Sequence, residues 1–423
     1  MLFAVTAINY ADRSALSIAG PAAAKQFGLS PISIGYIFSA FGWAYVLGQI
    51  PGGWLLDRFG SKRVYAVGLL CWSIFTGLQG FAGDLRILPP AIALFTFLFV
   101  TGLAESPSLP GNARIVAAWF PTAERGMASA IFNSAQYFAT VVFAPLMGWI
   151  THSFGWQYTF WMMGSLGIAL TPVWWKVIHM PKQHPRITRS ELKHLESGGA
   201  LLDMSDGANQ ARIGKSETLS TVKQLLENRM LLGIYIGQYC ISTLTYFFLT
   251  WFPIYLIQGR GMSIVKAGIV ASLPALCGFG GGVLGGVFSD RLLKKGSSLS
   301  VSRKTPIVIG MVLSTSMILC KYVNAQWVIV SIMCFAFLGK GIGALGWAVI
   351  SDTAPKVSAG LCGSIFNTFG NAAAITTPII IGHIVEKTKS FNGALIFVAA
   401  NAIGAVASYI FVVGDIKRVE LSH

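Results

Sequence analysis

Long apolar stretches separated by short polar ones are the dominant pattern of this chain. A helix needs roughly 20 apolar residues to cross a hydrocarbon core of ~30 Å. Twelve stretches approach that length, near residues 2–24, 33–57, 64–83, 88–113, 124–150, 156–179, 229–257, 264–290, 304–323, 326–352, 357–385 and 391–414. The pattern predicts an all-α membrane protein with twelve transmembrane helices. In the eighth stretch Gly278, Gly282 and Gly286 recur every four residues, which indicates close helix packing.

One long polar stretch, 180–228, divides the twelve predicted helices into two sets of six. It contains two short amphipathic segments, near 189–197 and 218–228. We therefore expect an N-terminal bundle at 1–179, a linker at 180–228 and a C-terminal bundle at 229–423.

Composition agrees with a membrane protein, because 54% of the residues are hydrophobic and only 11% are charged, with a mean hydropathy of +0.64. A soluble domain carries roughly a quarter charged residues.

The net charge of +15 follows the predicted topology. Of the 31 Lys and Arg residues, 21 fall on one set of loops, which includes the linker and the C-terminus. Seven fall on the opposite loops: Lys25, Arg86, Arg260, Lys266, Lys321, Lys387 and Lys389. The positive-inside rule then predicts a cytoplasmic linker and a cytoplasmic C-terminus. We interpret the basic character as topological, with the lipid bilayer and not nucleic acid as the partner.

A charged turn occurs twice along the chain. Asp57-Arg58 closes the second apolar stretch and Asp290-Arg291 closes the eighth, 233 positions later. Two halves that carry the same turn are typical of secondary transporters. Asp57 at a helix end can pair with a basic residue or with a neighbouring helix N-terminus, and Arg114 is a candidate partner. We therefore expect these residues to gate one side of the protein.

Three charged residues lie deep within apolar stretches, where insertion of each costs about 2.5–3.5 kcal/mol. They are Asp12, Arg13 and Glu105. One interpretation is a structural ion pair between Arg13 and Glu105. The interpretation we favour is functional: two carboxylates exceed one buried cation, and a proton can neutralise the surplus. Asp12 and Glu105 are then the proton sites, and Arg13 binds an anionic ligand.

Lys340 is the corresponding feature of the second half, where it lies among glycines. It either snorkels to the membrane interface or offers a second cation to the ligand. Polar and aromatic residues in the same stretches are candidate contacts for a hydroxylated ligand, although each alone is more often a packing residue. They are Tyr10, Tyr45, Asn133, Gln136, Tyr137, Gln238, Tyr246, Trp347 and Asn367.

Enzyme chemistry has little support in the chain. The six cysteines are scattered without metal-ligand spacing, and no His cluster or nucleophile–base arrangement stands out. We expect no cofactor, no metal and no enzymatic activity. The first apolar stretch starts at residue 2 and is interrupted by Asp12 and Arg13, so it is unlike a cleaved signal peptide. The cytoplasmic tail that usually precedes such a stretch is missing, and the sequence leaves open a truncation or a late start.

The whole chain resembles the major facilitator superfamily. The motif at 53–63 (GWLLDRFGSKR) carries the resemblance, with a weaker echo at 286–295. Similarity to the anion:cation symporter family rests on 9–13 (NYADR), 38–41 (FSAF), 49–53 (QIPGG) and 105–107 (ESP). Within that family the chain is most similar to bacterial glucarate/galactarate permeases, through 131–140 (IFNSAQYFAT), 247–253 (FFLTWFP), 339–347 (GKGIGALGW) and 413–418 (VGDIKR).

This resemblance implies two pseudo-symmetric six-helix bundles in a bacterial inner membrane and proton-coupled uptake of a sugar acid. Family roles map proton sites onto Asp12 and Glu105 and a carboxylate contact onto Arg13. Contacts to the sugar map onto Tyr45, Gln136, Trp347 and Asn367. One departure is Leu98, because family members usually carry Arg seven residues before the glutamate. A monomer suffices for alternating access.

The charge pattern adds a hypothesis about specificity. Aldarates carry a carboxylate at each end, so Arg13 and Lys340 would take one each. The competing interpretations are an organic-anion exchanger or facilitator for a hexonate or hexuronate, a receptor without flux, and a membrane enzyme.

Overall fold

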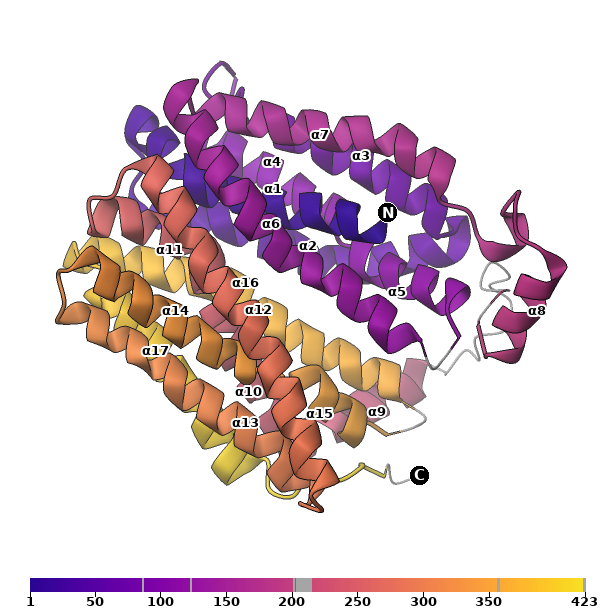
Figure 1. Ribbon diagram of the computed structural model, residues 1–423. Helices are drawn as coiled ribbons and strands as arrows, with labels where there is room; N and C mark the ends of the chain where they lie inside the picture. The colour runs from indigo at the N-terminus through magenta and orange to yellow at the C-terminus, as the bar shows by residue number, and fades with distance from the viewer. Residues whose placement is uncertain (86, 122–123, 201, 203–214, 356–357, 421–423) are drawn as a thin grey trace. The chain divides into compact units, whose positions relative to one another are not determined.

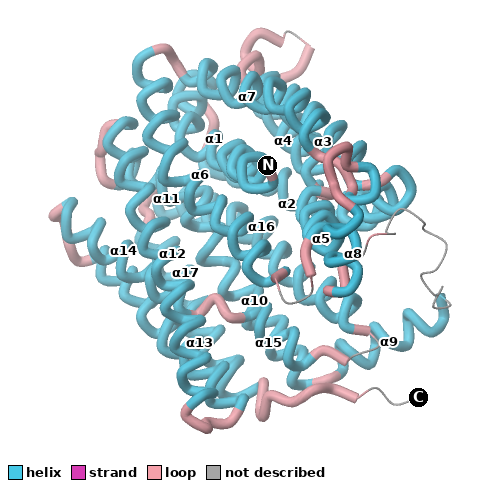
Figure 2. Tube along the Cα trace, turned by 45° about the vertical axis from the view of Figure 1, so that its right-hand side comes forward, coloured by secondary structure: helices cyan, strands magenta, loops and turns pink. Residues whose placement is uncertain are grey.

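The computed structural model contains helices and loops, with no strand among the residues it describes (Figures 1 and 2). It describes residues 1–423 except 86, 122–123, 201, 203–214, 356–357 and 421–423. The chain forms two compact units. The first comprises Met1–Leu29 and Ala40–Ala211, and the second comprises Ser30–Ser39 and Arg212–His423. The expected limits at 1–179, 180–228 and 229–423 stay a prediction.

Each of the twelve predicted stretches coincides with a helical segment in the described part of the chain. The first six are α1 (Leu2–Phe27), α2 (Pro31–Phe59), α3 (Ser61–Gln79), α4 with α5 (Pro90–Glu105 and Ser108–Trp119), α6 (Arg125–Ser153) and α7 (Trp156–Val177). The linker contributes η1 (Pro181–Gln183), α8 (Arg189–Ser197) and α9 (Lys215–Glu227), and α8 and α9 coincide with the two predicted amphipathic segments.

The last six segments include several irregular turns. They are α10, η2, α11 and η3 (Arg229–Tyr246, Phe247–Trp251, Phe252–Ile254 and Tyr255–Gly259), α12 (Ile264–Lys294), α13 with η4 (Leu299–Ser314 and Thr315–Lys321), α14 with α15 (Gln326–Ile342 and Gly346–Thr353), α16 (Ala359–Thr388), and α17 with η5 (Asn392–Ala407 and Ser408–Val412).

Eight of the twelve described segments are long and apolar enough, by length and composition, to cross a membrane. The other four are α1, α3, α6 and α7. In α1 the reason is visible, because Asn9 and Asp12 are buried and Arg13 is nearly so. Polar groups that face a bundle interior lower the mean hydropathy of a helix without exposing charge to lipid.

The same helix pairs pack within each unit. In the first unit α1 lies against α6 and α3 lies against α7. In the second unit α10 lies against α16 and α13 lies against α17. The first segment of each set thus packs on the fifth, and the third packs on the sixth. This repeated pairing is the structural counterpart of the repeated charged turn.

The fourth and tenth segments are both interrupted. The fourth breaks after Glu105, where Pro107 cannot donate a backbone hydrogen bond. The tenth breaks between Ile342 and Gly346. Broken membrane helices commonly mark the sites of secondary transporters, because unwound backbone is tolerated only inside the protein or along a cavity. Glu105 and Trp347 therefore each lie beside a helix break.

The predicted glycine contact in α12 is correct in kind but wrong in two of its three residues. A Cβ on Gly282 or Gly286 would meet open space. A Cβ on Gly281 or Gly285 would collide with backbone carbonyls of α14, those of Leu338 and Ile342 respectively. The face of α12 that packs on α14 thus includes Gly278, Gly281 and Gly285, which are three and four residues apart.

Candidate functional site

A buried ion pair joins α1 to the end of α4 in the first unit. Arg13 Nε donates a hydrogen bond to Glu105 Oε2 over 2.9 Å, and the two side chains are 8% and 0% exposed. Charges taken out of water are tolerated when they are paired at close range. The ion pair between Arg13 and Glu105, which was the interpretation we did not favour, is therefore present, and any functional role of these residues has to include it.

Aromatic rings surround the guanidinium of Arg13. Its central carbon lies 4.8 Å from the ring centroid of Tyr10, 4.5 Å from Phe41 and 5.2 Å from Tyr45. Phe41 and Tyr45 are stacked on each other with centroids 5.6 Å apart. A desolvated cation over several rings gains about 2 kcal/mol from the ring quadrupoles. The rings hold Arg13 in a fixed orientation, and Tyr10 and Tyr45 do so whether or not they touch a ligand.

Asp12 supplies the second carboxylate of this cluster. Its side chain is 3% exposed and interacts electrostatically with both Glu105 and Arg13. Neither carboxylate oxygen accepts a hydrogen bond from a described residue, and the neighbouring Trp72 indole lies outside hydrogen-bond geometry. Oε1 of Glu105 likewise accepts none from the described residues. Two close carboxylates beside one guanidinium in a dry interior form an arrangement that can take up a proton.

Leu98 occupies the position two helical turns before Glu105. It is 4% exposed and brings no charge to the cluster. A positive residue there would balance the second carboxylate. The cluster of Asp12, Arg13 and Glu105 thus keeps a surplus of negative charge when both carboxylates are ionised.

Lys340 is a buried cation of the second unit. Its side chain is 7% exposed, and Nζ lies 5.2 Å from the ring centroid of Phe337. Within the described residues Lys340 has no ion pair and no hydrogen bond to another side chain. Burial without a counter-ion is costly, so an anion that reaches Nζ would be bound strongly. Burial also argues against snorkelling to the interface.

The other residues predicted to contact the ligand are divided between the two units. Gln136 is half-buried in α6 of the first unit. In the second unit the indole of Trp347 is 56% exposed and packs edge-on against Phe366, while Asn367 is half-buried one residue further along α16. The side chain of Asn133 lies outside the described part of the chain.

Two of the predicted candidates, Gln238 and Tyr246, have hydrogen-bond partners in the second unit that we did not predict, Ser242 and Asn371. Gln238 donates a hydrogen bond to Ser242 over 3.3 Å, and Tyr246 donates one to Asn371 over 3.2 Å. Asn371 lies one turn after Asn367, so the helical spacing of these two asparagines was an available signal. Tyr137, also named as a candidate, is half-buried in α6.

The predicted gating residues are only partly described. The side chain of Asp57 lies outside the described residues, so its expected pairing with Arg114 stays a prediction. Arg58 is exposed and lies 5.3 Å from the ring centroid of Trp54. Arg114 is half-buried in α5, and Arg291 is exposed at the end of α12.

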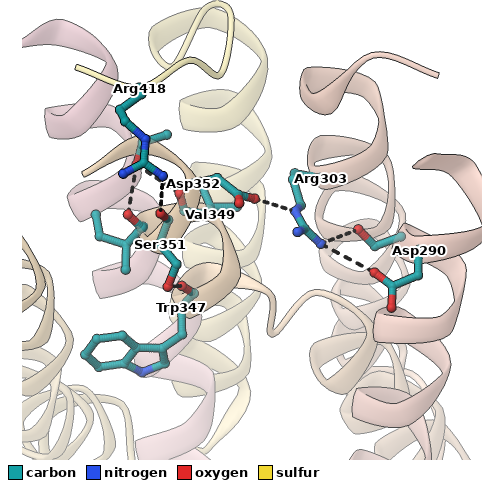
Figure 3. Close-up of polar contacts among 10 residues, drawn as sticks. Asp290, Arg303, Trp347, Val349, Ser351, Asp352 and Arg418 are labelled. Carbon is teal, nitrogen blue, oxygen red and sulfur yellow. Dashed lines mark hydrogen bonds and ion pairs between the residues drawn. The ribbon is translucent and has the colours of Figure 1, made fainter. Parts of the chain in front are cut away.

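Arg303 is a gating candidate that the sequence pattern missed. It pairs with Asp352 over 2.8 Å and with Asp290 over 3.8 Å, and it donates a hydrogen bond to the Ser289 hydroxyl over 3.0 Å (Figure 3). It therefore links the end of α12, the start of α13 and the end of α15. A basic residue near the start of the helix that follows an Asp-Arg turn was the available signal.

Comparison with known proteins agrees with this architecture. The family model of the Major Facilitator Superfamily matches residues 2–302. The probable galactarate/D-glucarate transporter GudP of Escherichia coli (strain K12) is 60% identical over 421 residues, which cover 100% of this chain and 94% of that protein. The probable galactarate/D-glucarate transporter GudP of Bacillus subtilis (strain 168) is 61% identical over 424 residues, covering 100% and 92%.

Solved structures show the same fold at low sequence identity. A D-xylose-proton symporter aligns with a TM-score of 0.71 and 14% identity, over 97% of this chain and 96% of that one. A point mutant of the nucleoside transporter NupG aligns with a TM-score of 0.71 and 13% identity, over 97% and 98%. At such identities the likeness concerns the fold alone, which confirms the predicted all-α membrane architecture.

Proposed function

Since this chain belongs to the major facilitator superfamily and is a multi-pass membrane transporter with sugar-acid transporters as close relatives, we propose that it is a proton-coupled importer of an aldarate. D-glucarate and galactarate are the named ligands of those relatives. The coupled ion is assigned to the cluster of Asp12, Arg13 and Glu105. The transport cycle is alternating access, in which a loaded state is favoured by protonation.

The observation that carries this proposal is the charge of the buried cluster. Arg13 pairs with Glu105 at 2.9 Å, and Asp12 lies beside them without a hydrogen-bond donor from the described residues. When a sugar-acid carboxylate approaches Arg13, it competes with Glu105 for the same guanidinium. Glu105 released from the pair then gains from protonation, because an unpaired charge in a dry site is costly. Substrate and proton would thereby bind together.

Labelled glucarate uptake into proteoliposomes tests this function. Accumulation only when the vesicle interior is alkaline is the expected result. Glu105→Gln should abolish this accumulation and retain exchange of internal for external glucarate, because the substitution fixes the neutral state. Asp84→Asn, at an exposed turn, is the matched control. Full accumulation by Glu105→Gln would remove Glu105 from the coupling mechanism.

The competing function is exchange or facilitated transport of another sugar acid, such as a hexonate or hexuronate. The ion pair between Arg13 and Glu105 favours this competing function if the pair persists. A Glu105 that stays charged through the whole cycle would carry no proton. Uptake stimulated by internal substrate and indifferent to the pH gradient would identify this function.

Orientation and assembly belong to the same proposal. The excess of Lys and Arg on one set of loops supports a bacterial inner-membrane protein whose linker and C-terminus face the cytoplasm. The gating roles are assigned to Asp57, Arg58, Arg114, Asp290 and Arg291. A single chain performs the cycle.

A further inference from the structure

The last described residues of the chain, 413–420, contain a motif that transport chemistry leaves unexplained. After η5 the backbone turns at Gly414, which adopts a left-handed φ of 57°. The chain then runs along the end of the second unit, with Val413 and Ile416 buried. Burial of apolar side chains fixes this tail against the helices. We call residues 413–420 the tail.

The tail contacts α15 through the carbonyl groups at the end of that helix. Arg418 Nη1 donates to the Ala354 carbonyl over 3.2 Å, and Nη2 donates to the Ser351 carbonyl over 3.3 Å (Figure 3). The backbone N–H of Val419 donates to the Thr353 carbonyl over 2.9 Å. The last carbonyls of a helix lack partners within the helix, and a cation is favoured at that end. The tail therefore caps α15.

The tail also contacts α13, so it bridges two helices. The backbone N–H of Ile416 donates to the Ser300 hydroxyl over 2.7 Å. The carboxylate of Asp415 lies within electrostatic range of Lys304 on the same helix. Arg303 of α13 is in turn paired with Asp352 in the last turn of α15. The end of α15 is thus held from two sides, by the tail and by α13.

The direction of α15 depends on these contacts with the tail and with α13. α15 has eight residues and follows a break, so continuous helix does not fix its direction. At its start Gly346 fits so closely against Gln238 and Phe366 that a Cβ would lie 2.6 Å from Gln238 Oε1. Trp347 is the next residue, and the Ser351 hydroxyl donates to the Trp347 carbonyl over 2.8 Å. A tilt at the end of α15 would therefore move the Trp347 indole.

We propose that Arg418 is a positioning residue, which fixes the orientation of Trp347 by capping α15. The consequence for transport rests on the proposed function, in which Trp347 contacts the sugar acid. The positioning itself is independent of that assignment. A lost cap would leave the helix present but change the direction in which its first turn presents the indole.

Fluorine NMR on the full chain tests the positioning directly. The protein is labelled with 5-fluorotryptophan, and Trp347→Phe assigns one resonance among the 12 tryptophans. Arg418→Gln should shift or broaden this resonance, and Lys417→Gln should leave it unchanged, because Lys417 is an exposed neighbour of equal charge. Val419→Pro removes one N–H donor to α15 without touching a charge and should act like Arg418→Gln. An unchanged Trp347 resonance in both tail variants would overturn the proposal.

Uptake kinetics separate the positioning of Trp347 by Arg418 from the proposed contact between Trp347 and the sugar acid. We expect Arg418→Gln to raise the KM for glucarate by about threefold to tenfold with the maximal rate unchanged, because a misdirected Trp347 would lose about one contact with the sugar acid. Arg418→Lys, which can reach only one carbonyl, should fall between. A moved Trp347 resonance with an unchanged KM would support the positioning and count against Trp347 as a substrate contact.

Discussion

Arg13 and Glu105 are joined by a 2.9 Å hydrogen bond at the point where the fourth membrane segment breaks. Glu105 is the last residue of α4, so the pair ties α1 to the start of the break. Because Asp12 precedes Arg13 directly, a single proton changes the net charge of the whole cluster from −1 to zero. The same three side chains thus carry the buried ion pair and the proposed proton site.

Removing the cation alone should destabilise the protein strongly. Arg13→Gln leaves two carboxylates in a dry site, which costs about 3–5 kcal/mol in the free energy of unfolding. The double variant Arg13→Gln/Glu105→Gln removes the unpaired charge of Glu105 and should recover most of that loss without recovering uptake. Thermal unfolding in detergent and vesicle uptake measure the two effects.

The matched control for this pair is Glu386→Gln/Lys389→Gln. That pair is joined over 3.0 Å, but its lysine is 75% exposed, so its loss should change stability by less than about 1 kcal/mol. Restored uptake in the double Arg13/Glu105 variant would show that the buried pair serves the fold alone.

Asp12→Asn should separate coupling from folding. The carboxylate accepts no hydrogen bond from the described residues, so the neutral amide loses little and the protein should be as stable as wild type or more so. Proton-driven accumulation of glucarate should disappear, whereas counterflow of labelled for unlabelled glucarate should continue. Accumulation at the wild-type level would leave Glu105 as the sole candidate proton site.

Hydropathy predicted the helical segments, and charge position identified the buried charged residues, because both follow from the cost of burying polar groups. The pairing of Arg13 with Glu105 was only the alternative that we did not favour. The twelve predicted stretches all contain helix, and Arg13 lies beside Glu105 although 92 residues separate them. The family resemblance added the substrate class, which the residues alone did not supply.

Details that depend on helix rotation and tertiary contact were not predictable from the pattern. The glycine contact of α12 falls on Gly281 and Gly285, because a four-residue repeat does not determine which side of a helix meets its neighbour. Arg303 was missed because its partners Asp290 and Asp352 lie on different helices. The capping of α15 by Arg418 depends on a turn at Gly414 that brings distant residues together.

Lys340→Met should distinguish dicarboxylate from monocarboxylate substrates. The hypothesis is that Arg13 binds one carboxylate of an aldarate and Lys340 binds the other. The substitution keeps a long flexible side chain and removes the charge, so only a ligand with two carboxylates should lose a contact. We expect the KM for glucarate to rise by about tenfold to a hundredfold, as for a lost charge-assisted hydrogen bond, and that for galactonate to change much less. Lys321→Met, at an exposed lysine 5.5 Å from the Tyr322 ring, is the control. Equal losses for both substrates would rule out a role in binding the second carboxylate.

The capping box of α8 should make the stability of this linker helix depend on pH. Hydrogen bonds to Glu191 from the backbone N–H and the hydroxyl of Thr188, each over 2.8 Å, lower the pKa of that carboxyl. A lowered folded-state pKa means that Glu191 stabilises the helix above the ordinary glutamate pKa of about 4.3, and that this contribution is lost as pH falls through the lowered value.

Amide exchange at residues 189–195 measures this effect. Protection should be constant near neutral pH and should fall in acid, and Glu191→Gln should reduce the acid-dependent change. Glu196→Gln, at an exposed position of the same helix, should retain it. An identical acid response in wild type and Glu191→Gln would show that another group is responsible.

Paired glycine substitutions in α12 test the contact with α14. Gly282→Ala faces open space and should stabilise the protein by up to about 1 kcal/mol, since alanine favours helix over glycine. Gly281→Ala gains the same propensity but pushes a methyl group into the Leu338 carbonyl, so a net loss of about 1–3 kcal/mol is expected from overpacking. Thermal unfolding in one detergent compares the two directly. Because the variants differ by one position on one helix, equal stabilities would mean that α12 packs on α14 through another face.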